Sequence, residues 1–187
     1  MALSINEIKA GLTVFVDDHA WVVVDCQHIK PGKGAAFTRA KLRNLKNGSV
    51  QDKTFRGNET IEEAYIEERK LQYQYSSGDM YHFMDQDNYE ELAIAHESMG
   101  DKSKFLKDNL EVTALFYKEG LLAVNLPNFI EFTIISTEPG IRGDTSKSGN
   151  KPAQIDSNAT IQVPLFVNPG DKIKVDTRTG TYVERVN

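Results

Sequence analysis

The chain has 187 residues, 40% of them hydrophobic and 26% charged, with a formal net charge of −5 at pH 7. This length and composition predict a globular protein of one or two average domains, or of three small ones, and exclude a binder that is basic over its whole surface. The single cysteine, Cys26, excludes an intramolecular disulfide and fits a reducing compartment. No run reaches membrane-spanning length and the N-terminus lacks signal-peptide features, so we expect a cytoplasmic protein without a membrane partner.

Charge is distributed unevenly along the chain. Residues 1–58 hold nine basic and five acidic side chains, a net charge of +4. Residues 59–119 carry a net charge of −9, and residues 120–187 are neutral overall. We therefore expect a nucleic-acid partner to meet the first third, with the last third as a second candidate, while the acidic middle faces elsewhere.

The first 64 residues predict a small β-barrel. β-branched and aromatic residues fill four runs that are separated by turn signals such as Asn47-Gly48. Residues 59–63 predict a helical turn that leads out of the barrel. The four predicted strands are 12–16, 20–29, 36–43 and 50–55.

Residues 30–35, between the second and third of these strands, read Lys-Pro-Gly-Lys-Gly-Ala. Two β-type runs joined by a segment with proline and glycine predict a hairpin. Pro31 fixes one φ angle, whereas Gly32 and Gly34 allow left-handed backbone on both sides of Lys33. The sequence therefore predicts a narrow finger with a lone ammonium group at its tip.

The strand after the finger carries a row of cations. Residues 26–51 include no Asp or Glu, and because strand side chains alternate, Arg39, Lys41 and Arg43 share one face. Together with Lys30, this row predicts a footprint for a phosphate backbone. An ordinary surface hairpin with solvated cations is the alternative that the spacing leaves open.

The rest of the chain repeats the pattern of short strands and turns. In the middle third, residues 96–108 are the best candidate for a helix. In the last third, residues 138–152 predict a long loop, and Tyr182 and Arg185 lie three residues apart, on opposite faces of the last predicted strand. We predict an all-β chain of three consecutive barrels, the later ones of the oligonucleotide-binding (OB) type, over 1–64, 65–127 and 128–187.

The sequence gives little support to an enzyme, a metal site or a cofactor site. Its four histidines are scattered, and residues 85–88 begin like a calcium loop but lack the glycine and glutamate at the required spacing. The Gly32-Lys33-Gly34 segment lacks the remaining residues of a nucleotide phosphate loop. Two alternatives stay open: a general binder of single-stranded nucleic acid, and a small-ligand enzyme in the acidic third.

Three separated motifs resemble bacterial translation elongation factor P. Residues 30–37 resemble the tip loop of that family. Its C-terminal signature is matched by residues 139–171 and by the ending, residues 176–186. Asn158 departs from the glycine that the family usually has, but asparagine tolerates left-handed backbone, so we expect the turn to survive.

The resemblance implies both a fold and a function. The family has an N-terminal SH3-like (KOW-like) barrel and two OB barrels in an L-shaped arrangement similar to tRNA. It binds the 70S ribosome between the P and E sites and stimulates peptide bond formation on ribosomes stalled at consecutive prolines. The resemblance thus implies a non-enzymatic accessory factor, without cofactor, which we expect to be a monomer.

The resemblance also assigns residues. Lys33 matches the residue that a lysine-modifying enzyme extends and that reaches the acceptor end of peptidyl-tRNA in the P site. Gly143, Asp144 and Thr145 match the loop that approaches the E-site mRNA codon. The candidates for contact with tRNA or rRNA are Lys30, Gly32, Lys33, Gly34, Arg39, Lys41, Arg43, Tyr182 and Arg185.

Overall fold

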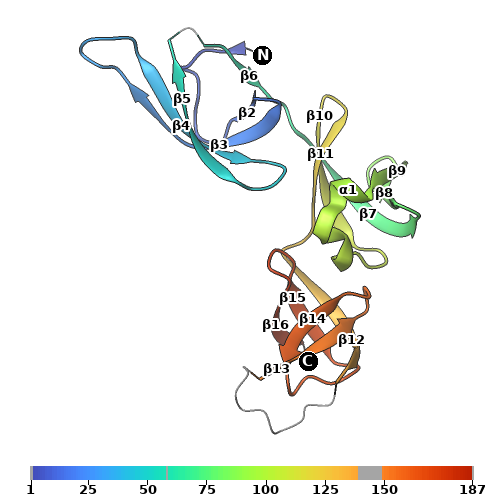
Figure 1. Cartoon of the computed structure of the whole chain (residues 1–187). Coiled ribbons are helices and arrows are strands. Elements are labelled where there is room, and N and C mark those ends of the chain that lie inside the picture. The colour runs from blue at the N-terminus through green and yellow to red at the C-terminus, as the bar shows by residue number, and fades with distance from the viewer. Residues whose placement is uncertain (1, 58, 139–148, 187) are drawn as a thin grey trace. The chain divides into compact units, whose positions relative to one another are not determined.

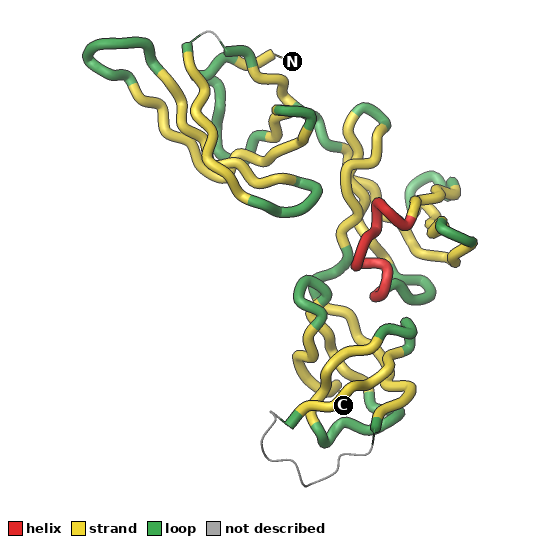
Figure 2. The backbone as a smooth tube through the Cα atoms, in the orientation of Figure 1, coloured by secondary structure: helices red, strands yellow, loops and turns green. Residues whose placement is uncertain are grey.

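The computed structural model of the chain describes residues 2–57, 59–138 and 149–186. Strands dominate it and fall into three sheets, so the predicted all-β class is confirmed (Figures 1 and 2). Contacts along the chain group the residues into two compact units, Met1–Arg69 with Ala114–Ala123, and Lys70–Thr113 with Val124–Asn187. The three-domain boundaries at 64/65 and 127/128 stay a prediction.

The first sheet has six strands in the order β1-β6-β2-β3-β4-β5. Its core contains Val14, Trp21, Leu42 and Phe55, all nearly inaccessible to solvent, supplied by strands whose apolar residues alternate with polar ones. Neighbouring strands pair antiparallel throughout. The strands are β1 (Ala2–Leu3), β2 (Thr13–Val16), β3 (His19–Ile29), β4 (Phe37–Asn44), β5 (Val50–Arg56) and β6 (Ile61–Glu63).

The predicted helical turn at 59–63 is wrong, because residues 61–63 form strand β6. Ile61 is buried, and Glu62 pairs with both Ala2 of β1 and Phe15 of β2. Three residues are too few to show a period of two, and both pairing partners are distant in sequence. The strand is therefore created by its neighbours rather than by a local preference.

The second sheet has the order β11-β10-β7-β8-β9, in which β7, the first of these strands along the chain, pairs with β8 and β10. A short helix, α1 (His96–Met99), and a 3-10 helix, η1 (Gly100–Phe105), connect β9 to β10. The helix predicted over 96–108 is therefore shorter and divided, since Gly100 at φ +53° ends the α-helical turn. The strands are β7 (Glu67–Ser77), β8 (Met80–Asp85), β9 (Glu91–Ala95), β10 (Glu111–Tyr117) and β11 (Gly120–Asn125).

The third sheet repeats this connectivity in the order β14-β13-β12-β15-β16, and β14 also contacts β16. This five-stranded arrangement is the partly open Greek-key barrel of the OB type. The core contains Phe132, Ile155, Val163 and Ile173. The strands are β12 (Phe129–Thr137), β13 (Asn150–Ile155), β14 (Thr160–Pro164), β15 (Lys172–Asp176) and β16 (Thr181–Val186).

Two details of the third sheet bear on the sequence predictions. The loop predicted over 138–152 ends earlier than expected, because residues 150–152 begin strand β13, which pairs with β12 and β14. Asn158 adopts φ +64°, so the turn expected at this position is present with asparagine in place of glycine. Residues 139–148 of the loop lie outside the described residues.

Candidate nucleic-acid interface

The finger is the turn of the β3–β4 hairpin, and this prediction is confirmed. The last paired residues are Ile29 and Phe37, and the hairpin projects beyond the other strands of its sheet (Figure 1). Gly34 adopts φ +117°, a conformation that L-residues with a side chain rarely adopt. Gly32 lacks a positive φ, so of the two glycines that allow left-handed backbone beside Lys33 only Gly34 adopts it. A single glycine is sufficient to turn the chain here.

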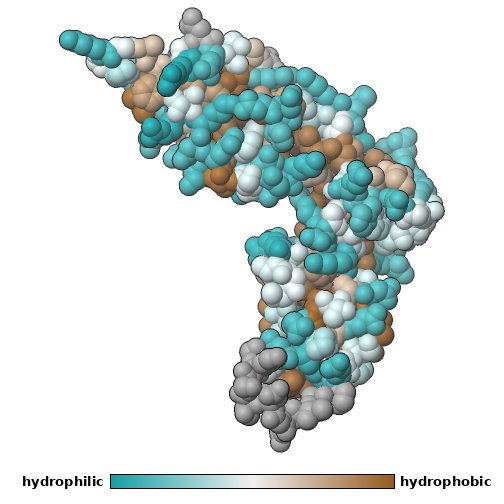
Figure 3. Space-filling model, in the orientation of Figure 1, coloured by the Kyte–Doolittle hydropathy of each residue, from teal (hydrophilic) through white to brown (hydrophobic). Residues whose placement is uncertain are grey.

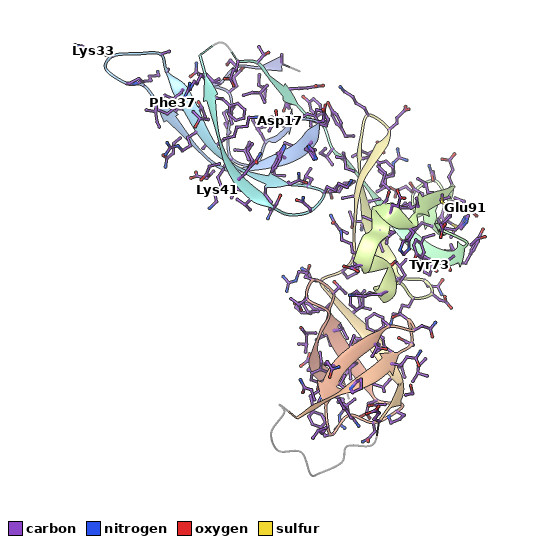
Figure 4. All side chains as sticks on the ribbon, in the orientation of Figure 1. Asp17, Lys33, Phe37, Lys41, Tyr73 and Glu91 are labelled. Carbon is purple, nitrogen blue, oxygen red and sulfur yellow. The ribbon has the colours of Figure 1, made fainter. Side chains whose placement is uncertain are left out.

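Lys33 lies at the end of the finger, where Figure 4 shows it pointing away from the sheet. Its side chain is exposed, as are Gly32 and Gly34 beside it. None of the ion pairs among the described residues involves Lys33. The tip is hydrophilic over its visible surface (Figure 3). The ammonium group is thus free to meet a partner outside the chain.

Strand β4 presents its cations on one face, as its alternation predicts. Arg39, Lys41 and Arg43 are exposed, while the residues between them are buried. Thr38 anchors the buried side, because its hydroxyl donates to the carbonyl of Ile5 at 2.9 Å. The strand therefore cannot slip by one residue without burying its charges.

The row of cations is interrupted by two carboxylates that the sequence analysis missed. Lys41 lies directly opposite Asp25 of β3 and Asp52 of β5, and directly opposed residues share a face. Asp25 reaches this position because a β-bulge at Val24 shifts the register between β3 and β4. Arg39 instead lies opposite Gln27 and Thr54, both uncharged. Arg43 likewise lies opposite the uncharged Val22 and Val50, so Lys41 is the one cation of the row with directly opposed carboxylates, and Arg39 is the uncompensated cation nearer the finger.

Tyr182 and Arg185 share a face of β16, contrary to the prediction from their spacing. Tyr182 pairs with Val175 and Arg185 with Ile173, because the register shifts by one residue at Val183. Arg185 lies 3.7 Å from Asp171 and its guanidinium is 5.9 Å from the centre of the Phe166 ring. Phe166 is 58% exposed.

The barrel that carries the finger is joined to the tip of the β10–β11 hairpin. Tyr117 stacks on Phe15 with ring centroids 4.9 Å apart, and its hydroxyl donates to Glu62 at 2.7 Å. Lys118 pairs with the same carboxylate oxygen at 2.6 Å. Hydrogen bonds from Lys118, the larger effect, and from Tyr117 lower the pKa of Glu62. In turn, the hydrogen bond to the Glu62 carboxylate raises the pKa of Lys118 to about 12. We call Phe15, Glu62, Tyr117 and Lys118 the hairpin clasp.

The acidic third uses its titratable side chains to hold turns and strands together. Asp85, buried in β8, accepts hydrogen bonds from the backbone N–H groups of Asp87 and Asn88. The first carboxylate of the segment that resembled a calcium loop thus holds the turn at the end of β8. On the neighbouring surface, Glu91 pairs with the His82 imidazole at 2.7 Å. Among the described residues, no group of three or more histidine, cysteine, aspartate or glutamate side chains is placed to hold a metal ion.

The predicted mRNA-codon loop, Gly143, Asp144 and Thr145, lies outside the described residues. Lys30 is exposed at the base of the finger, on the same hairpin as the cations of β4. The finger and this face thus come together on one sheet, whereas Tyr182 and Arg185 belong to another. No helix in the described parts of the chain combines the length and apolar character needed to cross a membrane.

The chain is thus an all-β protein with an exposed lysine finger on its first sheet, followed by two further sheets of OB-type connectivity. Three family models match it in succession: the elongation factor P KOW-like domain over residues 4–61, the OB domain over 66–124 and the C-terminal domain over 124–185. The chain belongs to the elongation factor P family, and as a translation elongation factor it interacts with the ribosome.

Full-length relatives agree with this assignment, and a solved structure shares the fold. Elongation factor P of Natranaerobius thermophilus is 47% identical over 181 residues, 97% of this chain and 96% of the relative. Elongation factor P of Thermoanaerobacter sp. strain X514 is 48% identical over 184 residues, 98% of this chain and all of the relative. A translation initiation factor eif-5a family protein from Naegleria fowleri shares the fold, with a TM-score of 0.55 and 13% identity over 67% of this chain and 98% of that one.

Proposed function

We propose that the protein binds the 70S ribosome between the P and E sites and relieves stalling at consecutive prolines by placing Lys33 against the acceptor end of peptidyl-tRNA. The observation that carries this proposal is the exposed ammonium group at the tip of a thin hairpin, free of any ion pair with the described residues. A carboxylate of the same chain beside Lys33 would have neutralised it. Its absence among those residues leaves the charge available to phosphate.

The proposed mechanism is orientation of the substrates rather than acid or base catalysis. Proline is a constrained residue with a fixed φ angle, so consecutive prolines can hold the nascent chain and peptidyl-tRNA in poor geometry. A cation on a narrow finger can contact the RNA backbone without crowding the reacting atoms. Correct orientation of reactants is worth up to about 7–11 kcal/mol in the best cases. In this proposal the ribosome remains the catalyst and the chain is a cytoplasmic accessory factor.

RNA contacts are proposed for the face that leads away from the finger. Lys30 and the exposed cations of β4 would neutralise phosphates, and Gly32 and Gly34 would let backbone approach the RNA closely. Tyr182 and Arg185 are proposed as further contacts on the third sheet. Gly143, Asp144 and Thr145 are proposed to approach the E-site codon on the basis of the family resemblance alone.

The exposed tip also suits covalent modification. A lysine-modifying enzyme would find Lys33 with its amine in solvent and flanked by two glycines, neither of which carries a side chain to block access. The intact mass of the native protein, with mapping of the peptide that contains Lys33, would identify any extension.

The test is relief of stalling by a Lys33→Ala variant. We expect this variant to fold normally and to lose its effect on translation of a Pro-Pro-Pro reporter in a reconstituted system. Lys46→Ala is the matched control, because it removes an exposed lysine from the β4–β5 turn, at the other end of the strand from the finger. Retained relief by Lys33→Ala, or equal loss in both variants, would contradict the proposal.

A further inference from the structure

Two cationic side chains, Lys102 and Arg178, line a hollow of about 440 Å³ where η1, the end of β11 and the β15–β16 turn meet. These elements belong to one compact unit. The hollow has a partly apolar wall and carries no carboxylate in its lining. Its lining residues are Lys102, Asn125, Leu126, Asn128, Thr177 and Arg178.

Lys102 lines the hollow from the 3-10 helix η1. Its ammonium donates to the carbonyl of Val124 at 2.6 Å, and no ion pair among the described residues compensates its charge. An ammonium has three donors, so two remain beyond the one used for Val124. Burial lowers the pKa of Lys102, as expected for a cation partly withdrawn from water without an anionic partner. A bound anion would restore the charge balance.

Arg178 supplies N–H donors and is held in place by Asp176, whose carboxylate offsets part of the guanidinium charge and leaves Lys102 as the uncompensated cation of the lining. Its Nε and Nη2 atoms donate to the two carboxylate oxygens of Asp176, at 3.0 and 2.6 Å, and its remaining N–H groups are available. The adjacent Thr177 hydroxyl donates to the carbonyl of Pro127 at 2.7 Å. This bond fixes the β15–β16 turn against the segment that carries Asn128. The wall of the hollow is therefore preorganised.

We propose that this hollow binds a phosphate group. The Lys102 ammonium provides a point charge, the outer edge of the Arg178 guanidinium provides further N–H donors, and the Asn125 and Asn128 carboxamides complete the set. The volume exceeds that of one phosphate, so a group that carries the phosphate can also enter. An RNA phosphodiester and free inorganic phosphate share this chemistry. The site is separate from the finger and does not depend on the function proposed for Lys33.

Titration of the isotope-labelled full-length chain tests the site. We expect inorganic phosphate, and separately a uridine trinucleotide, to cause saturable NMR shifts in the side-chain amides of Asn125 and Asn128. Lys102→Gln should weaken binding and so raise the dissociation constant at least tenfold. Lys104→Gln, which removes an exposed lysine from the same 3-10 helix outside the lining, should leave it unchanged within twofold.

The arms of the titration distinguish the sources of the phosphate. Tighter binding of the trinucleotide would identify an RNA phosphodiester, and binding of inorganic phosphate alone would identify the free ion; both support the site. Asn128→Asp, which places a carboxylate at the rim, should abolish binding and serves if Lys102→Gln fails to fold. The proposal is overturned if neither ligand causes saturable shifts, or if every variant that folds binds as the wild type does.

Discussion

At the scale of single residues, the finger depends on one glycine. Gly34 holds a positive φ, and a side chain added there would lie 3.8 Å from the Pro31 ring, an ordinary contact. Space is therefore available, and the backbone conformation alone excludes other residues. Gly32 has both open space and a φ outside the positive range. The two glycines flank the same lysine but have different physical roles.

This difference predicts opposite effects of alanine at the two positions. Gly34→Ala should lower the free energy of unfolding by about 1 kcal/mol, because alanine is strained at a positive φ. Gly32→Ala should leave it unchanged or raise it by about 0.4–1 kcal/mol, because alanine reduces the entropy of the unfolded chain. Urea unfolding of both variants measures this. A loss of stability from Gly32→Ala that matches that of Gly34→Ala would contradict the assignment.

At the scale of elements, the exposed face of β4 is less uniformly positive than its sequence. The bulge in β3 brings Asp25 opposite Lys41, and Asp52 lies opposite on the other side. These carboxylates would repel a phosphate that approached Lys41, whereas Arg39 has uncharged neighbours. The register of the sheet therefore decides which cations of β4 can bind an RNA phosphate.

Two matched substitutions check this ranking. Arg39→Gln should reduce the slope of log affinity for the ribosome against log salt concentration by about 0.7–0.9, the release expected for one phosphate contact. Lys41→Gln should reduce the slope by clearly less, because the flanking carboxylates already offset its charge. Binding measured over a series of salt concentrations tests both. Equal slopes for the two variants would refute the ranking.

At the scale of the whole molecule, the hairpin clasp joins parts that are distant in the chain. Glu62 bonds Tyr117 and Lys118, residues that lie 55 and 56 positions further on. Lys118 and Glu119 both adopt positive φ angles, which are costly for residues other than glycine. The contacts of the clasp help to offset this cost. The tip of the β10–β11 hairpin, residues Ala114–Ala123, groups with the first barrel, whereas the outer ends of both strands group with the second unit.

The clasp predicts a stability that depends on pH. Because the pKa of Glu62 is lowered in the folded state, its contribution is present above the ordinary value of 4.5 and is lost as the pH falls through the folded value. The raised pKa of Lys118 keeps the contribution intact below the ordinary value of 10.5 and removes it only as the pH rises through about 12. Glu62→Gln should therefore be less stable than wild type at pH 7.

Thermal unfolding of wild type and Glu62→Gln at pH 7 and at pH 3 measures this difference. We expect the gap between the two proteins to be smaller at pH 3 than at pH 7, because below the ordinary value of 4.5 the unfolded chain takes up a proton that the folded Glu62, with its lowered pKa, resists. Glu63→Gln is the control, since it removes the neighbouring carboxylate, which lies outside the clasp. A gap that stays constant with pH would show that Glu62 does not act through its charge.

The sequence by itself determined the features that depend on local periodicity and local backbone preference. Alternation of two was enough to locate the strands that flank the finger and to place Arg39, Lys41 and Arg43 on one face. Proline and glycine located the finger, and the motifs at 30–37 and in the C-terminal part pointed to the family.

The tertiary structure decided everything that depends on the register between distant strands. In the structure, residues 61–63 form a strand and Asp25 lies opposite Lys41. Tyr182 and Arg185 lie on one face of their strand, and Glu62 pairs with Lys118. Each of these outcomes depends on which residues of different strands lie opposite one another. That pairing is set by packing across the whole sheet, and the alternation within a single strand does not predict it.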